Sequence, residues 1–233
     1  MFHKIKSLLQ KNKLTNEIVT NYGFRTIFFS LGSFVIGVAY AAFNLVVALL
    51  YHNVWFGALA GYYVMLDIIR GGVLLNRYRL QKHNIEEEKR NVYEIKQYLI
   101  CGVLLIAMTA LLSAMVIHIA RQDKTFDYAV WIIYMAAGYT FYRIGIAVYN
   151  FVKSRQKHNF TIRALRCINL ATACVSFLSL QSAALTAFST GVNQTVVNAL
   201  TGGIVCGLIV LLGGFMIISA AIKLKACCPV CAD

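Results

Sequence analysis

The chain has 233 residues, of which 59% are hydrophobic and only 13% are charged, and its formal net charge is +13 at pH 7. Soluble domains carry roughly 25% charged residues, so this composition excludes an ordinary soluble protein. Long apolar blocks with a single proline favour transmembrane helices instead, and they leave little sequence for a soluble domain.

The chain begins with a basic segment, 1–25, in which lysines interrupt a short apolar stripe. This pattern lacks the features of a secretory signal and predicts an amphipathic helix on the cytoplasmic leaflet or a topology-setting tail. Apolar blocks that suit membrane crossing, for which about 20 residues are needed, come next. The six blocks cover 26–51, 54–75, 97–119, 127–151, 164–188 and 197–222. A cysteine-containing cytoplasmic tail, 223–233, follows them.

Part of the sequence recurs at an offset of 106 residues. The residues Ala41, Asn44, Val46, His52, Asn53, Ala58 and Leu59 recur as Ala147, Asn150, Val152, His158, Asn159, Ala164 and Leu165. If each copy holds three crossings, the second copy lies in the opposite sense across the membrane. We therefore predict an all-α integral membrane protein whose six transmembrane helices form two inverted three-helix repeats, 26–120 and 121–222. This plan is typical of transporters and resembles several small-solute exporter and channel folds.

Lysines and arginines gather before the first block, after the second, between the fourth and fifth, and after the sixth. The other ends of the blocks carry only Arg121 and Lys124. This alternation follows the positive-inside rule and predicts a multi-pass protein of the cell membrane, inner or plasma, with both termini in the cytoplasm. Topology then accounts for most of the basicity, and we expect no nucleic acid partner.

Charged residues inside apolar blocks are functional candidates, because charge in the bilayer is costly. The second block contains Asp67 and Arg70, which lie three positions apart and so share one helical face. The fourth block contains Arg143 at a similar depth. We expect Asp67 to bridge Arg70 within its helix and Arg143 across the bundle. Such a group suits a substrate or proton-coupling site, or a structural lock between two helices.

Four uncharged side chains complete the candidate pathway. Tyr142 lies beside Arg143, Asn44 and Asn150 are the polar pair that the repeat preserves, and Gln181 belongs to a moderately polar fifth block. Buried amides supply donors and acceptors without the full cost of a charge, so they suit a polar pathway as well as hydrogen bonds between helices. Helix packing is the simpler interpretation of the asparagines.

Glycine pairs with the spacing GxxxG occur in two blocks, as Gly57 with Gly61 and Gly203 with Gly207. Such pairs allow helix backbones to approach closely. We expect close helix packing at these pairs, either within the bundle or, where the glycines point outward, in a homo-oligomer.

The tail contains Cys228 and Cys231 in a CPVC motif, whose spacing is a weak indication of a metal site because no fourth ligand lies nearby. No metalloprotease, nucleophile-elbow or Walker A motif occurs in the sequence. We therefore expect neither an enzyme nor a resident cofactor.

The function that this pattern favours is transport of an ion or small polar metabolite by alternating access between the two halves. Asp67 would be the ion- or proton-responsive group, and Arg70 and Arg143 would tune its charge or contact an anionic cargo. An ion channel that uses the same polar path is the nearest alternative. A non-transporting scaffold or subunit that recruits a cytoplasmic partner is a third interpretation. The bilayer and the solute are the expected partners.

Overall fold

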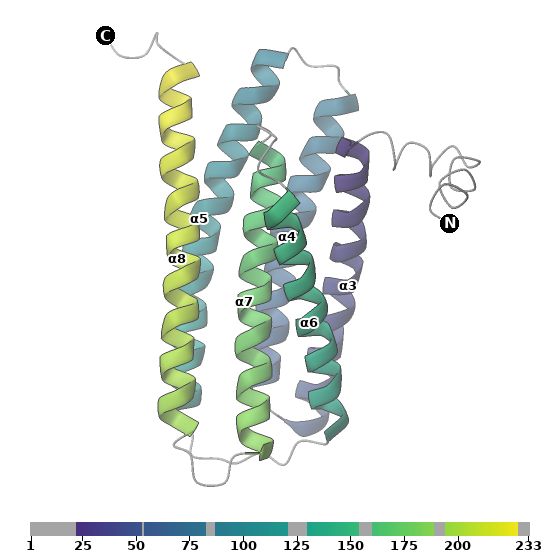
Figure 1. The fold of residues 1–233 in the computed structure, drawn as a ribbon, viewed down its shortest axis with the longest axis vertical. Coiled ribbons are helices and arrows are strands. Elements are labelled where there is room, and N and C mark those ends of the chain that lie inside the picture. The colour runs from purple at the N-terminus through teal and green to yellow at the C-terminus, as the bar shows by residue number, and fades with distance from the viewer. Residues whose placement is uncertain are drawn as a thin grey trace, which may run out of the picture.

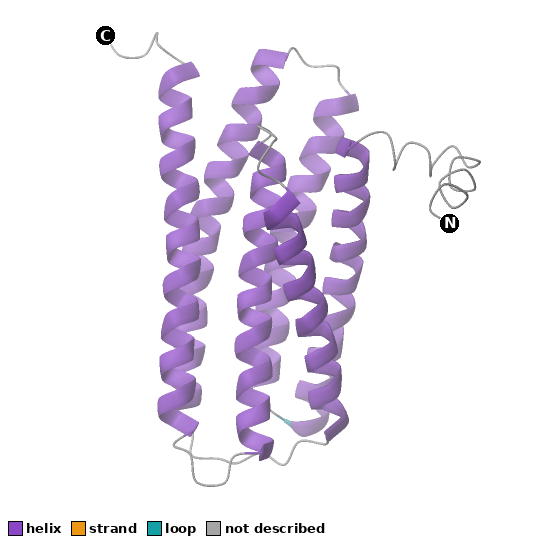
Figure 2. Ribbon diagram, viewed as in Figure 1, coloured by secondary structure: helices purple, strands orange, loops and turns teal. Residues whose placement is uncertain are grey.

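A computed structural model describes six stretches of the chain, and all of them are helical apart from the turn residue His52 (Figure 2). They cover residues 22–52, 54–82, 87–120, 130–153, 160–188 and 194–227. The helices are α3 (Tyr22–Tyr51), α4 (Val54–Lys82), α5 (Glu87–Ala120), α6 (Val130–Lys153), α7 (Phe160–Phe188) and α8 (Gln194–Cys227). Most of the predicted amphipathic segment, and both Cys228 and Cys231, lie outside the described residues.

Successive helices run in opposite directions, so α3 begins at the same end of the bundle at which α8 ends (Figure 1). The most extensive contacts join α5 to α8, α3 to α4, and α6 to α7. Helix α7 also packs against α4, α5 and α8, which places it at the centre of the bundle (Figure 1). The all-helical fold predicted from the sequence is confirmed.

Five of the six helices are long and apolar enough to cross a membrane. Their apolar spans are Leu31–Tyr51, Val54–Leu80, Lys89–Ile117, Phe160–Leu185 and Val196–Lys225. The helix α6, which overlaps the predicted fourth span, is not among them. The fold is consistent with a helical membrane protein with five such spans.

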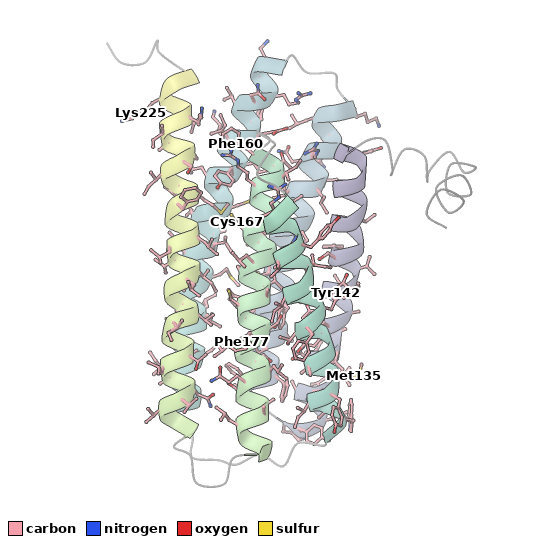
Figure 3. All side chains as sticks on the ribbon, viewed as in Figure 1. Met135, Tyr142, Phe160, Cys167, Phe177 and Lys225 are labelled. Atoms are coloured by element: carbon pink, nitrogen blue, oxygen red, sulfur yellow. The ribbon has the colours of Figure 1, made fainter. Side chains whose placement is uncertain are left out.

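Large apolar side chains cover the outside of the bundle along its length (Figure 3). Tyr134 is 72% exposed, Leu211 is 70% exposed and Leu49 is 67% exposed. Soluble monomers rarely expose contiguous apolar surface on this scale. In hydrocarbon the same surface has no such cost, so this pattern indicates a membrane-embedded protein.

The basic residues collect at one end of the bundle, where α3 begins, α4 ends, and α8 ends (Figure 1). Arg77, Arg79 and Lys82 lie near the last residue of α4, and Lys223 and Lys225 lie near the end of α8. We call this the basic end. No lysine or arginine lies near the opposite end of any helix among the described residues.

The glycines that bring helices together are not the ones that the GxxxG spacing indicated. A Cβ atom added at Gly61, Gly203 or Gly207 would meet nothing within 4 Å. Instead, α5 and α8 approach closely at Gly102 and Gly213, where a Cβ atom on either glycine would lie 3.0 Å from the other's carbonyl oxygen. These three glycines therefore do not bring helices of the bundle together, because spacing alone does not say which helix face meets a neighbour.

Candidate functional site

Asp67, Arg70 and Arg143 come together in the interior of the bundle, and we call these three residues the charged cluster. Their exposed fractions are 5%, 0% and 2%, so all three side chains are buried in the bundle. Arg70 Nη1 donates a hydrogen bond to Asp67 Oδ1 over 3.0 Å, and the pair forms a salt bridge within α4. The expected bridge inside this helix is present.

Arg70 also ties α4 to two neighbouring helices. Its Nη1 donates to the carbonyl oxygen of Ser33 on α3 over 3.2 Å, and its Nη2 donates to Thr172 Oγ1 on α7 over 3.3 Å. A three-residue spacing from Asp67 puts both charges on the face of α4 that meets these helices. Arg70 is therefore held by a carboxylate, a backbone carbonyl and a hydroxyl group.

Arg143 is held from α3 and from its own helix rather than by Asp67. Its Nη1 donates to Ser33 Oγ over 2.6 Å, and its Nε donates to Tyr139 Oη over 2.7 Å. Its guanidinium carbon lies 5.0 Å from the centre of the Tyr139 ring, within the range of a cation–π contact. Among the described residues, Asp67 pairs only with Arg70, so the expected second bridge to Arg143 does not form.

Gly37 of α3 leaves space for the two charged groups that do not pair, Asp67 and Arg143. A Cβ atom there would overlap the Asp67 carboxylate and would lie 2.8 Å from Arg143 Nη2. Asp67 Oδ2 and Arg143 Nη2 are both buried, and neither has a hydrogen-bond partner. Buried atoms of charged groups that lack hydrogen-bond partners are costly in a low-dielectric interior. The cluster could therefore form hydrogen bonds with a further polar or charged group.

Aromatic and hydroxyl side chains enclose the cluster on one side. The rings of Tyr40 and Tyr139 stack with centroids 3.5 Å apart, and Tyr63 meets both rings edge-on. Tyr63 Oη donates to Ser176 Oγ on α7 over 3.1 Å, and Thr140 Oγ1 donates to the Ser176 carbonyl oxygen over 3.1 Å. These contacts fix α3, α4, α6 and α7 around the charges.

The charged cluster lies well inside the bundle. At 1.5 Å per residue, Arg70 is about 18 Å from the end of α4 at the basic end, and Arg143 is about 15 Å from the end of α6. Residues from α3 and α4 supply one side of the cluster, and residues from α6 and α7 supply the other. The cluster therefore sits where the two parts of the chain meet.

The other candidates from the sequence lie elsewhere. Tyr142 is 39% exposed, whereas its neighbour in the sequence, Arg143, is buried. Asn44 is buried and donates to the Tyr40 carbonyl oxygen of its own helix over 2.8 Å. Gln181 donates to Thr201 Oγ1 over 2.7 Å and so links α7 to α8. The side chain of Asn150 is outside the described residues.

Comparison with known proteins found no match for this chain. No family model, no curated protein and no solved structure matches it. Within the described part of the chain, no three His, Cys, Asp or Glu side chains group as a metal site would require. The site must therefore be interpreted from its own geometry.

Sequence reasoning missed three residues that hold the cluster: Tyr139, Ser33 and Thr172. Tyr139 carried a usable signal, because it lies four positions before Arg143 and thus on the same helical face, whereas Tyr142 lies on a different face. Ser33 and Thr172 carried none, since small hydroxyl residues in apolar helices are common and often bond to their own backbone.

Proposed function

We propose that this protein is a small membrane transporter that moves a small negatively charged or polar solute by alternating access between its two halves. The observation that carries the proposal is the charged cluster at the junction of α3 and α4 with α6 and α7. Transporter sites typically lie near the membrane midplane between repeated halves. Buried polar residues that merely lock helices need not gather at that junction.

The charge balance of the cluster favours a cargo with negative charge. Two guanidinium groups and one carboxylate leave one positive charge without a partner, and both Arg143 Nη2 and Arg70 Nε lack hydrogen-bond partners. An anionic group would satisfy these donors and neutralise the excess charge. It would also compete with Asp67 for Arg70, which gives the carboxylate the ion- or proton-responsive role.

Two features support an inverted repeat that relates the halves. Exchanging α3 with α6, α4 with α7 and α5 with α8 turns the α3–α4 contact into the α6–α7 contact, and the α4–α5 contact into the α7–α8 contact, whereas the α5–α7 contact has no α4–α8 counterpart of similar extent. At the 106-residue offset Gly37 corresponds to Arg143, and these two residues lie against each other. Residues equivalent by a two-fold axis meet when they lie close to it, and the absent side chain at Gly37 leaves room for Arg143.

Ligand-induced stabilisation of the purified protein tests the proposal. We expect one class of anionic or polar solute to raise the Tm of the wild type, because a ligand at 100 times its Kd stabilises the native state by about 2.7 kcal/mol. In Asp67→Asn the same solute should lose its effect, or its effect should no longer depend on pH. The solute identified in this way is then assayed for uptake into vesicles that contain the protein.

Glu94→Gln is the matched control, because Glu94 is a buried carboxylate outside the charged cluster. This variant should keep the solute response of the wild type. If no solute stabilises the wild type, and Asp67→Asn only lowers its Tm, the cluster is a structural lock and the transport proposal fails. Uptake that shows weak saturation and no dependence on a second ion would indicate a channel.

A further inference from the structure

The charged cluster has different surroundings on its two sides along the bundle. On the side away from the basic end, five aromatic rings pack against one another, and we call them the aromatic group. They belong to Tyr40, Phe43, Tyr63, Trp131 and Tyr139. The centroids of paired rings lie between 3.5 and 6.1 Å apart, and such pairs stabilise the packing of helices. Close aromatic packing therefore closes this side of the cluster.

On the side toward the basic end, the face of α7 that meets the cluster carries polar side chains without partners. Thr172 marks this face, because its Oγ1 accepts from Arg70. Asn169 and Thr161 lie three and eleven positions before Thr172, which puts all three on one face at 3.6 residues per turn. Asn169 is 7% exposed and Thr161 is 1% exposed. Neither Asn169 Oδ1 nor Thr161 Oγ1 has a hydrogen-bond partner among the described residues.

Two arginines of α4 share the face that meets α7. Arg77 lies seven positions, about two turns, after Arg70, so the two lie on one face of the helix. The helices run in opposite directions, with Arg70 level with Thr172. Arg77 is therefore level with Leu165, which lies between the two polar residues of α7. The Nε atoms of both arginines also lack partners among the described residues. We call Arg70, Arg77, Thr161 and Asn169 the polar seam.

Helix α6 completes the seam beside Asn169. Thr140 of α6 donates to the carbonyl oxygen of Ser176 on α7, so these two residues are level. Seven residues further toward the basic end on each helix, Ala147 is level with Asn169. Ala147 is buried, and its methyl side chain offers the amide no hydrogen bond.

Opening the bundle has different consequences on the two sides of the cluster. At the polar seam, separation of the helices lets water bind four polar atoms that lack partners in the closed state. At the aromatic group, separation exposes apolar rings and breaks the hydrogen bonds that hold Tyr63 Oη and Tyr139 Oη. That side holds two unpaired atoms among the described residues, Asn44 Oδ1 and Tyr62 Oη. The seam is therefore the side that opens at the lower cost.

We propose that the polar seam is the gate of the charged cluster: the bundle opens along α4, α6 and α7 toward the basic end, while the aromatic group stays closed. This inference rests on the proposed function, because it names the side from which that site exchanges its solute. In the open seam Asn169 lies one turn from Thr172. Its amide oxygen and the Nε atoms of Arg70 and Arg77 then offer hydrogen bonds to a polar solute on its way to the cluster.

Thiol accessibility tests the proposal on the full protein in lipid nanodiscs, in which both ends of the bundle face water. The probe is the anionic reagent 2-sulfonatoethyl methanethiosulfonate, and mass spectrometry locates the label above the wild-type background. We expect Asn169→Cys to react on the order of tenfold faster than Ala171→Cys. Ala171 is the matched control, because it is buried at nearly the same depth of α7 but two positions away, and thus on the opposite face.

Two further variants test the two sides of the cluster. Ala147→Cys lies across the seam from Asn169 and should also react faster than Ala171→Cys. Ser179→Cys lies on the seam face of α7 but on the aromatic side of the cluster, and it should stay as unreactive as Ala171→Cys. Because Ala171→Cys reports general unfolding, faster reaction at the seam reports local opening.

Two results would overturn the proposal. Faster reaction of Ser179→Cys than of Asn169→Cys and Ala147→Cys would mean that the aromatic side opens instead. Reaction of Asn169→Cys and Ala147→Cys no faster than that of Ala171→Cys would mean that the seam does not open. These rates are measured without a solute, so the absence of a stabilising solute would count against the proposed function and not against the labelling result.

Discussion

At the scale of single residues, the charged cluster depends on small neighbours as much as on its charges. Ser33 accepts hydrogen bonds from both arginines, one at its side chain and one at its carbonyl oxygen. Gly37 leaves the space into which the Asp67 carboxylate and Arg143 Nη2 point. If the two halves are copies of one repeat, as proposed, the change from Gly37 to Arg143 between them has a packing reason.

Tyr139→Phe tests which tyrosine supports Arg143. The substitution removes the hydroxyl oxygen that accepts from Arg143 Nε, so a buried guanidinium nitrogen loses its partner. We expect the free energy of unfolding to fall by about 1 kcal/mol, measured by reversible denaturation in detergent or by the shift in Tm. The matched control is Tyr142→Phe, which removes a hydroxyl group from a tyrosine that is 39% exposed and should change little. Equal effects of the two variants would contradict the assignment.

At the scale of helices, the glycines fall into two groups, those at a close contact between helices and those that are exposed. Gly102, Gly202 and Gly213 let α5 and α8 approach, since an added Cβ atom would crowd the facing helix at each position. Gly61, Gly203 and Gly207 are exposed, and a Cβ atom added at any of them would meet nothing within 4 Å among the described residues. A homo-oligomer that uses these outward glycines stays a prediction from the sequence.

Gly213→Ala tests the α5–α8 contact. Its Cβ atom would lie 2.7 Å from Ile106 Cγ1 and 3.0 Å from the Gly102 carbonyl oxygen, so the two helices must separate. Overpacking of this kind costs about 1–3 kcal/mol, which should lower the Tm. The adjacent variant Gly214→Ala places a methyl group in open space and should keep or slightly raise the Tm, because alanine is the better helix former. A Tm for Gly213→Ala at or above that of Gly214→Ala would refute the contact.

At the scale of the whole molecule, helix direction gathers the basic residues at the end where α3 begins and α8 ends (Figure 1). The positive-inside rule assigns such an end to the cytoplasm. The orientation remains a prediction, and it determines the side from which the cluster would receive a solute. Since the cluster lies about 15–18 Å from the basic end, a solute of the proposed transporter would have to pass through the interior of the bundle to reach it.

Thiol labelling in intact cells tests the orientation. Val54 begins α4 at the end opposite the basic end, and Lys82 ends the same helix at the basic end. A membrane-impermeant thiol reagent should label Val54→Cys above the wild-type background, and it should label Lys82→Cys only after the membrane is permeabilised. Labelling of Lys82→Cys in intact cells, without labelling of Val54→Cys, would reverse the topology.

The sequence by itself determined the class of the protein and the identity of its central charges. Long apolar blocks predict helices because hydrocarbon offers the backbone no hydrogen-bond partners, so each segment must satisfy its own. Five of the six predicted spans coincide with helices that are long and apolar enough to cross a membrane, and the predicted fourth span coincides with α6. Asp67, Arg70 and Arg143 stood out because charge inside such blocks is rare and costly.

Only the tertiary structure decided how these residues are paired. It assigned Tyr139 rather than Tyr142 to Arg143, joined Asp67 to Arg70 alone, and placed Gln181 in a separate contact with α8. The physical reason is that a partner depends on how each helix is rotated about its axis and on the shape of the helix beside it. Periodicity along one segment specifies a face, whereas packing between segments specifies what that face meets.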